Sequence, residues 1–381
     1  MGHPRSGRGR LGCRSRDRAA GRGPVASPTV SPVRIERPRI GFLGAGLNAT
    51  FHSKLLHRSG LDLVRGAVYD PVRDRAERFA AASGSTVAGS EDEVLDGSDA
   101  VYVCSWTSEH PRLVAAAADR GVHVFCEKPL GVDLAAAESV LDMVVGAGIV
   151  HQVGLVLRRS PAFLVARELV RDAAAGEVMA VVFRDDQYIP TQGMYASTWR
   201  ADRHRAGAGT LLEHSIHDVD LLRMVVGDIT SVNAHQRNVH GHDGIEDVVS
   251  ATIRFDTGAL GSLTSVWHDN LARPSLRRVE VLCRHRHVVV DGHDWTGPVT
   301  WTDTDGSTTV LEGEGLELEA AAILEGEVMT ANPDADFVRS VMTGTPARPD
   351  VAVAVEAHRV VDAMYRSAAT DGATVALHRA G

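Results

Sequence analysis

The sequence lacks the features that mark membrane proteins, disulfide-rich proteins and zinc fingers. No apolar run approaches the roughly 18 residues of a membrane-spanning helix, which excludes an integral membrane protein. Four cysteines are scattered over 381 residues without a CxxC pair. That pattern excludes a disulfide scaffold and a zinc finger, and it suits the reducing cytoplasm, where we expect the protein. The composition is otherwise that of a globular protein, and the length predicts two domains.

Lysine is almost absent. Only Lys54 and Lys128 occur, against 38 arginines. A GC-rich coding sequence would favour arginine and explain this bias. A lysine that is kept under such a bias is also a candidate reactive amine, because the pKa of lysine can be tuned and that of arginine cannot.

Positive charge is concentrated at the start of the chain. Residues 1–38 hold nine arginines and two acids, a net charge of +7, and the remainder carries −16, from 31 basic and 47 acidic residues. So acidic a body argues against a nucleic-acid partner. The segment 1–37 is rich in Gly, Arg, Ser and Pro and is expected to be disordered. A transit peptide or a nucleic-acid-binding arm is possible, but we favour a dispensable extension.

A glycine-rich turn carries the strongest single motif. Residues 39–44 predict a buried strand that runs into Gly44-Ala-Gly46-Leu-Asn-Ala49 and then a helix. A second apolar strand, 61–69, ends at Asp70, 26 residues after Gly44. This order is typical of dinucleotide binding, since the glycines let the backbone approach a pyrophosphate and the acid accepts hydrogen bonds from ribose hydroxyls. A tight turn without a ligand is the alternative.

Strands and helices keep alternating up to about residue 153. Apolar runs at 100–104, 122–126 and 149–153 predict strands, and 71–82, 111–120 and 133–146 predict helices. Such alternation predicts an open parallel sheet, which binds ligands at the carboxyl ends of its strands. The loops 105–110 and 127–129 both follow strands, so Lys128 is expected beside the nicotinamide.

The second half begins with a helix at 161–175, a strand at 178–184 and an irregular segment at 185–209. A helix is then predicted over 211–226. On that helix Glu213 and His217 are four residues apart and share a face, with His214 and Asp220 nearby. A solvated surface face is one alternative, and a metal site made by Glu213, His214 and His217 is another, disfavoured because no fourth ligand is evident.

The rest of the chain is rich in strand patterns. Strands are predicted at 248–255, 259–267, 279–283 and 287–290, which indicates a largely antiparallel sheet. His268 follows one of these strands and is a candidate for the cleft or for a satisfied edge position. Helices are predicted at 337–342 and 351–368.

Together these motifs resemble the Gfo/Idh/MocA oxidoreductase family of glucose-fructose oxidoreductase and inositol dehydrogenase. The matching segments stand in the family's order and spacing: Gly44–Ala49, His110, Cys126-Glu-Lys-Pro129, Arg158–Pro161 and Gly209–Asp220. The resemblance covers residues 38 to 381. It implies an α/β fold with a Rossmann NAD(P)-binding domain at 38–155. It also implies an α+β domain at 156–381 with a large, mainly antiparallel open sheet for substrate binding and oligomerisation.

The resemblance also implies roles for particular residues. Lys128 and His217 take the catalytic positions, and Glu213 and His214 join them around the substrate; no metal is implied. The implied cofactor-binding residues are Gly44, Gly46, Leu47, Asn48, Asp70, Ser105, Trp106, Thr107, His110, Glu127, Lys128 and Arg158.

The sequence departs from the family at two places. The family usually has Asp where Glu213 stands, and it often reads Thr-Pro-Asn where this chain has Ser105-Trp106-Thr107. The first departure lengthens the side chain by one methylene, which changes the expected substrate geometry. At the second, Trp106 could stack on the nicotinamide or pack under its loop.

The implied reaction is hydride transfer between a secondary alcohol of a sugar or cyclitol and the cofactor. His217 would take or return the hydroxyl proton, and Lys128 would stabilise the oxyanion. Asp70 favours NAD because it repels a 2′-phosphate, while Arg73 leaves NADP possible. The family implies a homodimer or homotetramer. A non-catalytic dinucleotide sensor and an NAD-dependent glycosidase remain alternatives within the family.

Overall fold

The computed structural model describes residues 34–273, 275–293 and 295–377. Most of the predicted tail, 1–37, therefore lies outside the described residues. Its last four residues are described, and Ile35 packs against the hydrophobic cluster that contains Phe42. The backbone N–H of Ile35 also donates to the carbonyl oxygen of Met342 at 3.3 Å, which ties this short segment to the folded chain.

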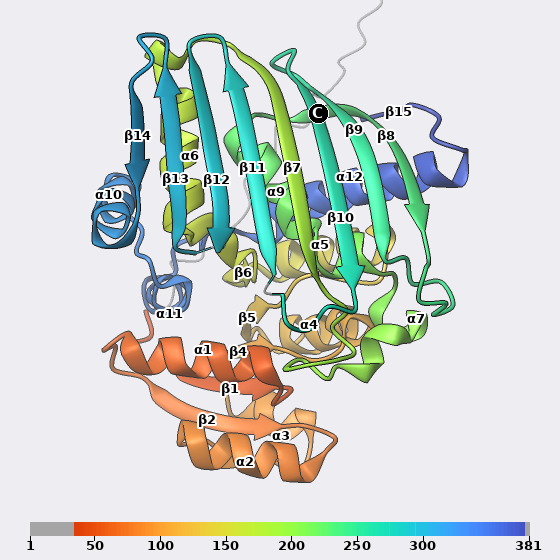
Figure 1. The fold of residues 1–381 in the computed structure, drawn as a ribbon. Helices are drawn as coiled ribbons and strands as arrows, with labels where there is room; N and C mark the ends of the chain where they lie inside the picture. Colours follow the sequence, from red (N-terminus) through yellow and green to blue (C-terminus); the bar gives the residue numbers. More distant parts are fainter. Residues whose placement is uncertain (1–33, 274, 294, 378–381) are drawn as a thin grey trace, which may run out of the picture. The chain divides into compact units, whose positions relative to one another are not determined.

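A six-stranded sheet forms the first part of the fold (Figure 1). Its order is β3-β2-β1-β4-β5-β6, and every neighbouring pair is parallel. This is the dinucleotide-binding order and confirms the predicted parallel sheet. Its strands are β1 (Arg39–Leu43), β2 (Val64–Tyr69), β3 (Thr86–Val87), β4 (Ala100–Val103), β5 (His123–Cys126) and β6 (His151–Val153).

Helices cover both faces of this sheet because its strands are apolar on both sides. One hydrophobic cluster joins the strands to α3, α4, α5 and the first turns of α12, and another joins them to α1, α2 and α11. The last two helices in the sequence thus return to the first sheet. The helices are α1 (Leu47–Arg58), α2 (Arg73–Ser83), α3 (Glu91–Asp96), α4 (His110–Ala118), α5 (Leu134–Ala147), α11 (Pro333–Thr343) and α12 (Val351–Ala369).

A nine-stranded sheet forms the second part, in the order β14-β13-β12-β11-β7-β10-β9-β8-β15. Only β7 and β10 pair in parallel among the described strands, so the sheet is largely antiparallel, as predicted. The strands are β7 (Val178–Tyr188), β8 (Ile229–Arg237), β9 (Val248–Phe255), β10 (Leu260–His268), β11 (Leu276–Cys283), β12 (Arg286–His293), β13 (Gly297–Asp303), β14 (Thr308–Leu311) and β15 (Val375–Ala376).

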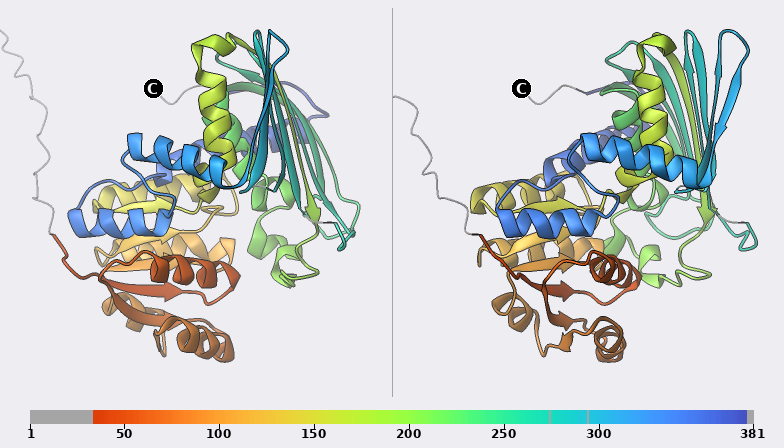
Figure 2. Two further views of the ribbon diagram at one scale, coloured as in Figure 1. Left: turned by 60° about the vertical axis from the view of Figure 1, so that its left-hand side comes forward. Right: turned by 90° about the vertical axis from the view of Figure 1, so that its left-hand side faces the viewer.

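Helices α6 (Pro161–Arg171), α9 (Ile216–Val225) and α12 cover one face of the nine-stranded sheet (Figures 1 and 2). Phe163, Ile216 and Val360 from these helices pack with Phe183 and Val249 of the strands in one cluster. Buried and exposed residues alternate along β9, because successive side chains of a strand point to opposite faces of the sheet. The buried residues of β9 face the helices, and the exposed ones lie on the other face.

Several elements differ from the sequence predictions. The sequence patterns did not indicate β13, β14 or α10 (Gly313–Gly326), and strand β7 runs four residues further than predicted. The predicted helix over 211–226 is interrupted, so that α8 (Thr210–Glu213) and α9 are separate. In the described parts of the chain, no helix is long and apolar enough to cross a membrane.

Candidate active site

The predicted cofactor loops gather at the carboxyl edge of the parallel sheet. The backbone N–H of Gly44 donates to Tyr69 O at 2.8 Å, and that of Glu127 donates to Val103 O at 3.0 Å. The chain therefore leaves neighbouring strands at the same level. Parallel register thus brings together Gly44–Asn48, Asp70, Ser105–Thr107 and Glu127–Lys128, as expected for an open α/β sheet.

The glycine turn fits a phosphate group. Gly44 has φ +97°, and a Cβ there would lie 2.5 Å from Cys104 O, so only glycine suits the position. A Cβ at Gly46 would meet no described atom within 4 Å, which shows open space at the start of α1. Gly46 is the N-cap residue of α1, and it has no side chain that could accept a hydrogen bond from the first N–H groups of the helix. The first N–H groups of this helix are thus left for an anion.

Asp70 braces this turn from the end of β2. Its carboxylate accepts hydrogen bonds from Ala45 N at 3.0 Å and Val72 N at 2.8 Å. Arg75 also lies 3.3 Å from it, whereas Arg73 pairs with Glu77. The arginine beside Asp70 is therefore Arg75 and not Arg73. Arg75 Nη1 donates to both carboxylate oxygens, at 3.3 and 3.4 Å, so with the two backbone donors the roughly four acceptor positions of the carboxylate are filled, and a ribose hydroxyl would take the place of the partly exposed Arg75.

Two residues fix the loop that follows β4. Buried His110 has Nδ1 2.7 Å from Pro129 O and Nε2 3.3 Å from Ser105 O, so it links this loop to the one after β5. Burial lowers the pKa of His110, in keeping with this structural position. The Arg205 guanidinium lies 4.0 Å from the centroid of the Trp106 ring, a cation–π distance. Trp106 therefore packs against a side chain of the protein on one face.

The break between α8 and α9 creates the centre of the site. His214 N and Ser215 N both donate to Thr210 O, at 3.1 and 2.8 Å, and His217 N donates to His214 O. The carbonyl oxygen of Glu213 is thus left without its intrahelical donor, and Lys128 Nζ donates to it at 2.6 Å. A widened turn of this kind often occurs at functional sites. The predicted i, i+4 alignment of Glu213 with His217 on one helix is therefore wrong.

Side chains from distant strands hold this break in place. The Glu246 carboxylate accepts from Gly209 N at 2.8 Å and Leu211 N at 3.0 Å, which anchors the start of α8. The Ser265 hydroxyl of β10 lies 2.7 Å from Thr210 Oγ1 and 2.6 Å from Ser215 Oγ. These hydroxyl contacts tie the residues on both sides of the interruption to β10.

The Glu213 carboxylate is buried and held by the protein. Thr107 Oγ1 donates to Oε1 at 2.5 Å, and Arg200 Nε donates to Oε2 at 3.1 Å. Only 3% of Glu213 is exposed. The residue therefore ties the loop after β4 to the segment after β7, and each of its carboxylate oxygens already accepts a hydrogen bond from the protein.

A buried charged cluster lies behind the break. Arg277 of β11 donates through Nε to Asp218 at 2.6 Å, and its Nη2 lies 3.1 Å from Asp185 and 3.0 Å from His214 Nε2. His214 Nε2 is also 2.8 Å from Asp185. Burial, helped by the charge of Asp185, raises the pKa of Asp218 to about 7 despite Arg277. Sequence reasoning missed Arg277 and Asp185, which reach the site only through the sheet.

His217 and Lys128 are both partly buried, and both keep hydrogen-bonding capacity beyond their contacts with the described residues. Burial lowers the pKa of Lys128, while the charges of Glu213 and Glu127 oppose that shift. Burial, followed by the charges of Lys128 and Arg277, lowers the pKa of His217 well below its usual value. The imidazole is thus neutral at physiological pH, and it makes no hydrogen bond with any residue that the structure describes. Lys54, the other lysine, is exposed on α1.

Arg158 is engaged elsewhere. Its guanidinium donates to both oxygens of Asp220 on α9, at 2.7 and 2.6 Å. It also lines a hollow of about 590 Å³ with Leu141, Arg167 and other residues of α5, α6 and α12. Within the described chain, Arg158 forms no hydrogen bond or ion pair with the other predicted cofactor residues.

The described residues contain no group of three or more His, Cys, Asp or Glu side chains with the geometry of a metal site. At the alternative metal site suggested by the sequence, Glu213, His214 and His217, the Glu213 carboxylate is instead paired with Arg200. His214 is likewise directed to Asp185 and Arg277.

Comparison with known proteins agrees with this arrangement. Residues 38–155 match the oxidoreductase family with an NAD-binding Rossmann fold, and residues 163–289 match the GFO/IDH/MocA C-terminal domain. The NAD(+)-dependent scyllo-inositol 2-dehydrogenase of Bacillus subtilis is 33% identical over 275 residues, which cover 66% of this chain and 76% of that protein. The myo-inositol 2-dehydrogenase of Thermotoga maritima is 29% identical over 70% of this chain and 79% of that protein.

A solved structure of levoglucosan dehydrogenase in complex with NADH and levoglucosan has the same fold. The TM-score is 0.76, and the similarity covers 90% of this chain and 99% of that one. The sequence identity is 21%, so this similarity shows the fold alone.

Proposed function

Because the chain belongs to the Gfo/Idh/MocA family of oxidoreductases, we propose that it is an NAD-dependent dehydrogenase of a sugar or cyclitol. It would transfer a hydride between a secondary alcohol and the nicotinamide. The inositol dehydrogenases among its relatives support a polyol substrate. The presence of both candidate catalytic residues, Lys128 and His217, supports an enzyme rather than a dinucleotide sensor.

The residues present fit a dinucleotide. The open space at Gly46 and the uncapped N-terminus of α1 would hold the pyrophosphate, and Asp70 would accept a hydrogen bond from the adenosine ribose. When bound, the nicotinamide supplies the hydride acceptor. The loops after β4 and β5 would orient it at the carboxyl edge of the sheet.

His217 and Lys128 would then both act on the hydroxyl group of the substrate. The neutral His217 imidazole can accept the hydroxyl proton, because its pKa lies below physiological pH. Lys128 spends one of its N–H donors on Glu213 O, and the remaining donors can stabilise the alkoxide oxygen. Hydrogen bonding to Glu213 O also fixes the direction of the Lys128 side chain.

One observation carries the proposal: the His217 imidazole, which hydrogen-bonds none of the described residues, lies within electrostatic reach of the lysine that follows β5. A purely structural histidine at partial burial would be expected to find a hydrogen-bond partner. The neighbouring histidines follow that rule, since His110 and His214 are both held by other residues.

The test is oxidation of a panel of polyols by the full chain with NAD, followed by the absorbance of NADH. The panel includes myo-inositol, scyllo-inositol, glucose and levoglucosan. We expect at least one to give NADH in the wild type, and His217→Ala to abolish most of that rate. NADH binding without oxidation of any polyol would favour a sensor. Cleavage of a glycoside without net NADH formation would favour a glycosidase.

A further inference from the structure

A buried histidine on α1 joins two buried carboxylates from distant parts of the chain. His52 Nε2 lies 2.9 Å from Glu127 Oε1 and His52 Nδ1 lies 2.8 Å from Asp334 Oδ1. These side chains are 5%, 8% and 0% exposed, in the order His52, Glu127, Asp334. We refer to these three residues as the buried triad.

The buried triad reaches the cofactor turn through Glu127. The second carboxylate oxygen of Glu127 accepts a hydrogen bond from Asn48 Nδ2 at 3.0 Å. Asn48 and His52 are four residues apart on α1, so one helix face presents both of them to the same carboxylate. A Cβ on Gly154 would lie 2.3 Å from Glu127 Oε1, which shows how tightly this carboxylate is enclosed. Lys128 is the next residue in the chain.

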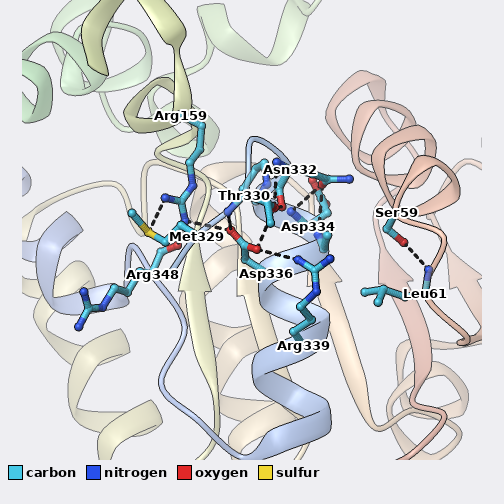
Figure 3. A network of polar contacts seen from close by, with 12 residues as sticks. Ser59, Leu61, Arg159, Met329, Thr330, Asn332, Asp334, Asp336, Arg339 and Arg348 are labelled. Carbon is cyan, nitrogen blue, oxygen red and sulfur yellow. Dashed lines mark hydrogen bonds and ion pairs between the residues drawn. The ribbon is translucent and has the colours of Figure 1, made fainter. Parts of the chain in front are cut away.

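The other end of the buried triad belongs to α11. Asn332 caps this helix by accepting hydrogen bonds from Asp334 N and Ala335 N, at 3.1 Å each. Its Nδ2 also donates to Leu55 O of α1 at 2.9 Å. Figure 3 shows Asn332 and Asp334 together at the start of α11, beside the contacts of Asp336. The start of α11 is therefore fixed to α1 by both Asn332 and Asp334.

The geometry fixes the charge of His52. Both ring nitrogens face carboxylate oxygens, and a neutral imidazole has only one N–H to donate. The doubly protonated ring satisfies both acceptors, and the rings of Phe125 and Tyr102 pack against it at 4.6 and 5.2 Å between centroids. Burial opposes this charge, but the two carboxylates outweigh it and raise the pKa of His52 to about 10. The same contacts hold the pKa of Glu127 low despite its burial.

We propose that the buried triad positions the residues of the cofactor site. The geometry of that site would then depend on how α11 packs against α1. Asp334 orients the His52 imidazolium, His52 holds Glu127, and Glu127 fixes Asn48 at the cofactor turn and the backbone that leads to Lys128. Glu127 thus acts through the turn and does not need to touch the nicotinamide. The inference rests on the proposed function only in taking this turn as the cofactor site.

The test compares NADH affinity in the full-length wild type and in His52→Gln and Asp334→Asn, by titration of NADH fluorescence. His52→Gln should bind NADH roughly tenfold more weakly, because the charged hydrogen bond that orients Glu127 is lost, and Asp334→Asn should weaken NADH binding to a smaller extent. Asp334→Asn is the milder change, since its amide oxygen can still accept from His52. The double variant should bind NADH about as weakly as His52→Gln alone, because both act through one contact.

His123→Leu is the matched control. His123 accepts one hydrogen bond, from Val150 N, at the opposite end of β5. This variant should lower the melting temperature without changing NADH affinity. If the triad variants also lose only melting temperature and keep the wild-type affinity, the proposal is overturned.

Nitrogen NMR of the histidine rings gives a second readout without any cofactor. The histidine signal that is missing from the spectrum of His52→Gln is assigned to His52. In the wild type at pH 8 this signal should be that of a doubly protonated ring. A neutral ring at that pH contradicts the proposal. A wild type that binds NADH but oxidises no polyol contradicts the proposed function and leaves this proposal standing.

Discussion

Lys128 Nζ donates a 2.6 Å hydrogen bond to the backbone carbonyl oxygen of Glu213. The break between α8 and α9 leaves that carbonyl without its intrahelical donor, so the lysine completes a helix end that the fold interrupts. This contact joins the loop after β5 to the end of α8, just before the helix α9 that carries His217. It places the ammonium group and the imidazole close enough for the charge of Lys128 to lower the pKa of His217.

Removing either group should separate catalysis from cofactor binding. Lys128→Met and His217→Ala should each lower kcat by roughly a hundredfold or more, because oxyanion or acid–base assistance is lost. NADH affinity should change far less, since the pyrophosphate would be held by the turn at Gly44–Ala49. Rate measurements with a polyol and fluorescence titration with NADH test both parts.

Lys54→Met is the control for the loss of a lysine. Lys54 is exposed on α1, so this variant should keep both the rate and the affinity. Parallel losses of melting temperature and NADH affinity in Lys128→Met and His217→Ala would instead show that these residues only support the fold.

Glu213 should matter for stability more than for substrate choice. Thr107→Val removes one donor to its carboxylate and should lower the free energy of unfolding by about 1–3 kcal/mol, because a buried charged acceptor loses its partner. Glu213→Asp is one methylene shorter and should lose the contact with Thr107 or with Arg200. Both variants should keep the order of preference across a polyol panel. A changed order would show that Glu213 touches the substrate, as the sequence alone suggested.

Local sequence patterns were enough to predict the first sheet and its ligand edge. The turn at Gly44, the acid at Asp70 and the alternation of strands with helices are all encoded within short segments. The sequence likewise indicated Lys128 and His217 through the resemblance to a family. The structure then shows them near the same helix break.

Long-range contacts were beyond the sequence. The interruption after Glu213 depends on Ser265 and Glu246, which lie on other elements, so the periodicity of 211–226 predicted an unbroken helix. The pairing of His52 with Asp334 spans 282 positions in the chain. The spacing of Asn48 and His52 on one helix face was the only local sign of that contact.

The cofactor should be NAD, and the residues around Asp70 give a sharp test. Its carboxylate should repel a 2′-phosphate, so kcat/KM with NAD should exceed that with NADP by roughly tenfold or more. Arg75→Ala should widen this ratio, because Arg75 is the cation beside Asp70. Arg73→Ala is the matched control and should leave the ratio unchanged, since Arg73 pairs with Glu77. A wild type that prefers NADP contradicts the assignment.

Buried His358 should make the protein sensitive to acid. Its Nε2 accepts a hydrogen bond from Leu130 N at 3.0 Å, and burial lowers its pKa to about 3. Above its unfolded pKa of about 6.5 the ring is neutral in both states and contributes no pH dependence. Below that value the unfolded chain binds a proton that the folded chain does not. The free energy of unfolding therefore falls as the pH falls, down to about pH 3.

The variant His358→Gln should remove this acid sensitivity while its amide oxygen still accepts from Leu130 N. Each pH unit below 6.5 costs the wild type about 1.4 kcal/mol through this residue. Between pH 7 and pH 5 the variant should therefore lose roughly 2 kcal/mol less of its unfolding free energy than the wild type. Urea unfolding at the two pH values measures the difference. His285→Gln, at an exposed position, is the control. If His358→Gln keeps the full pH dependence of the wild type, then a neutral buried His358 is not its source.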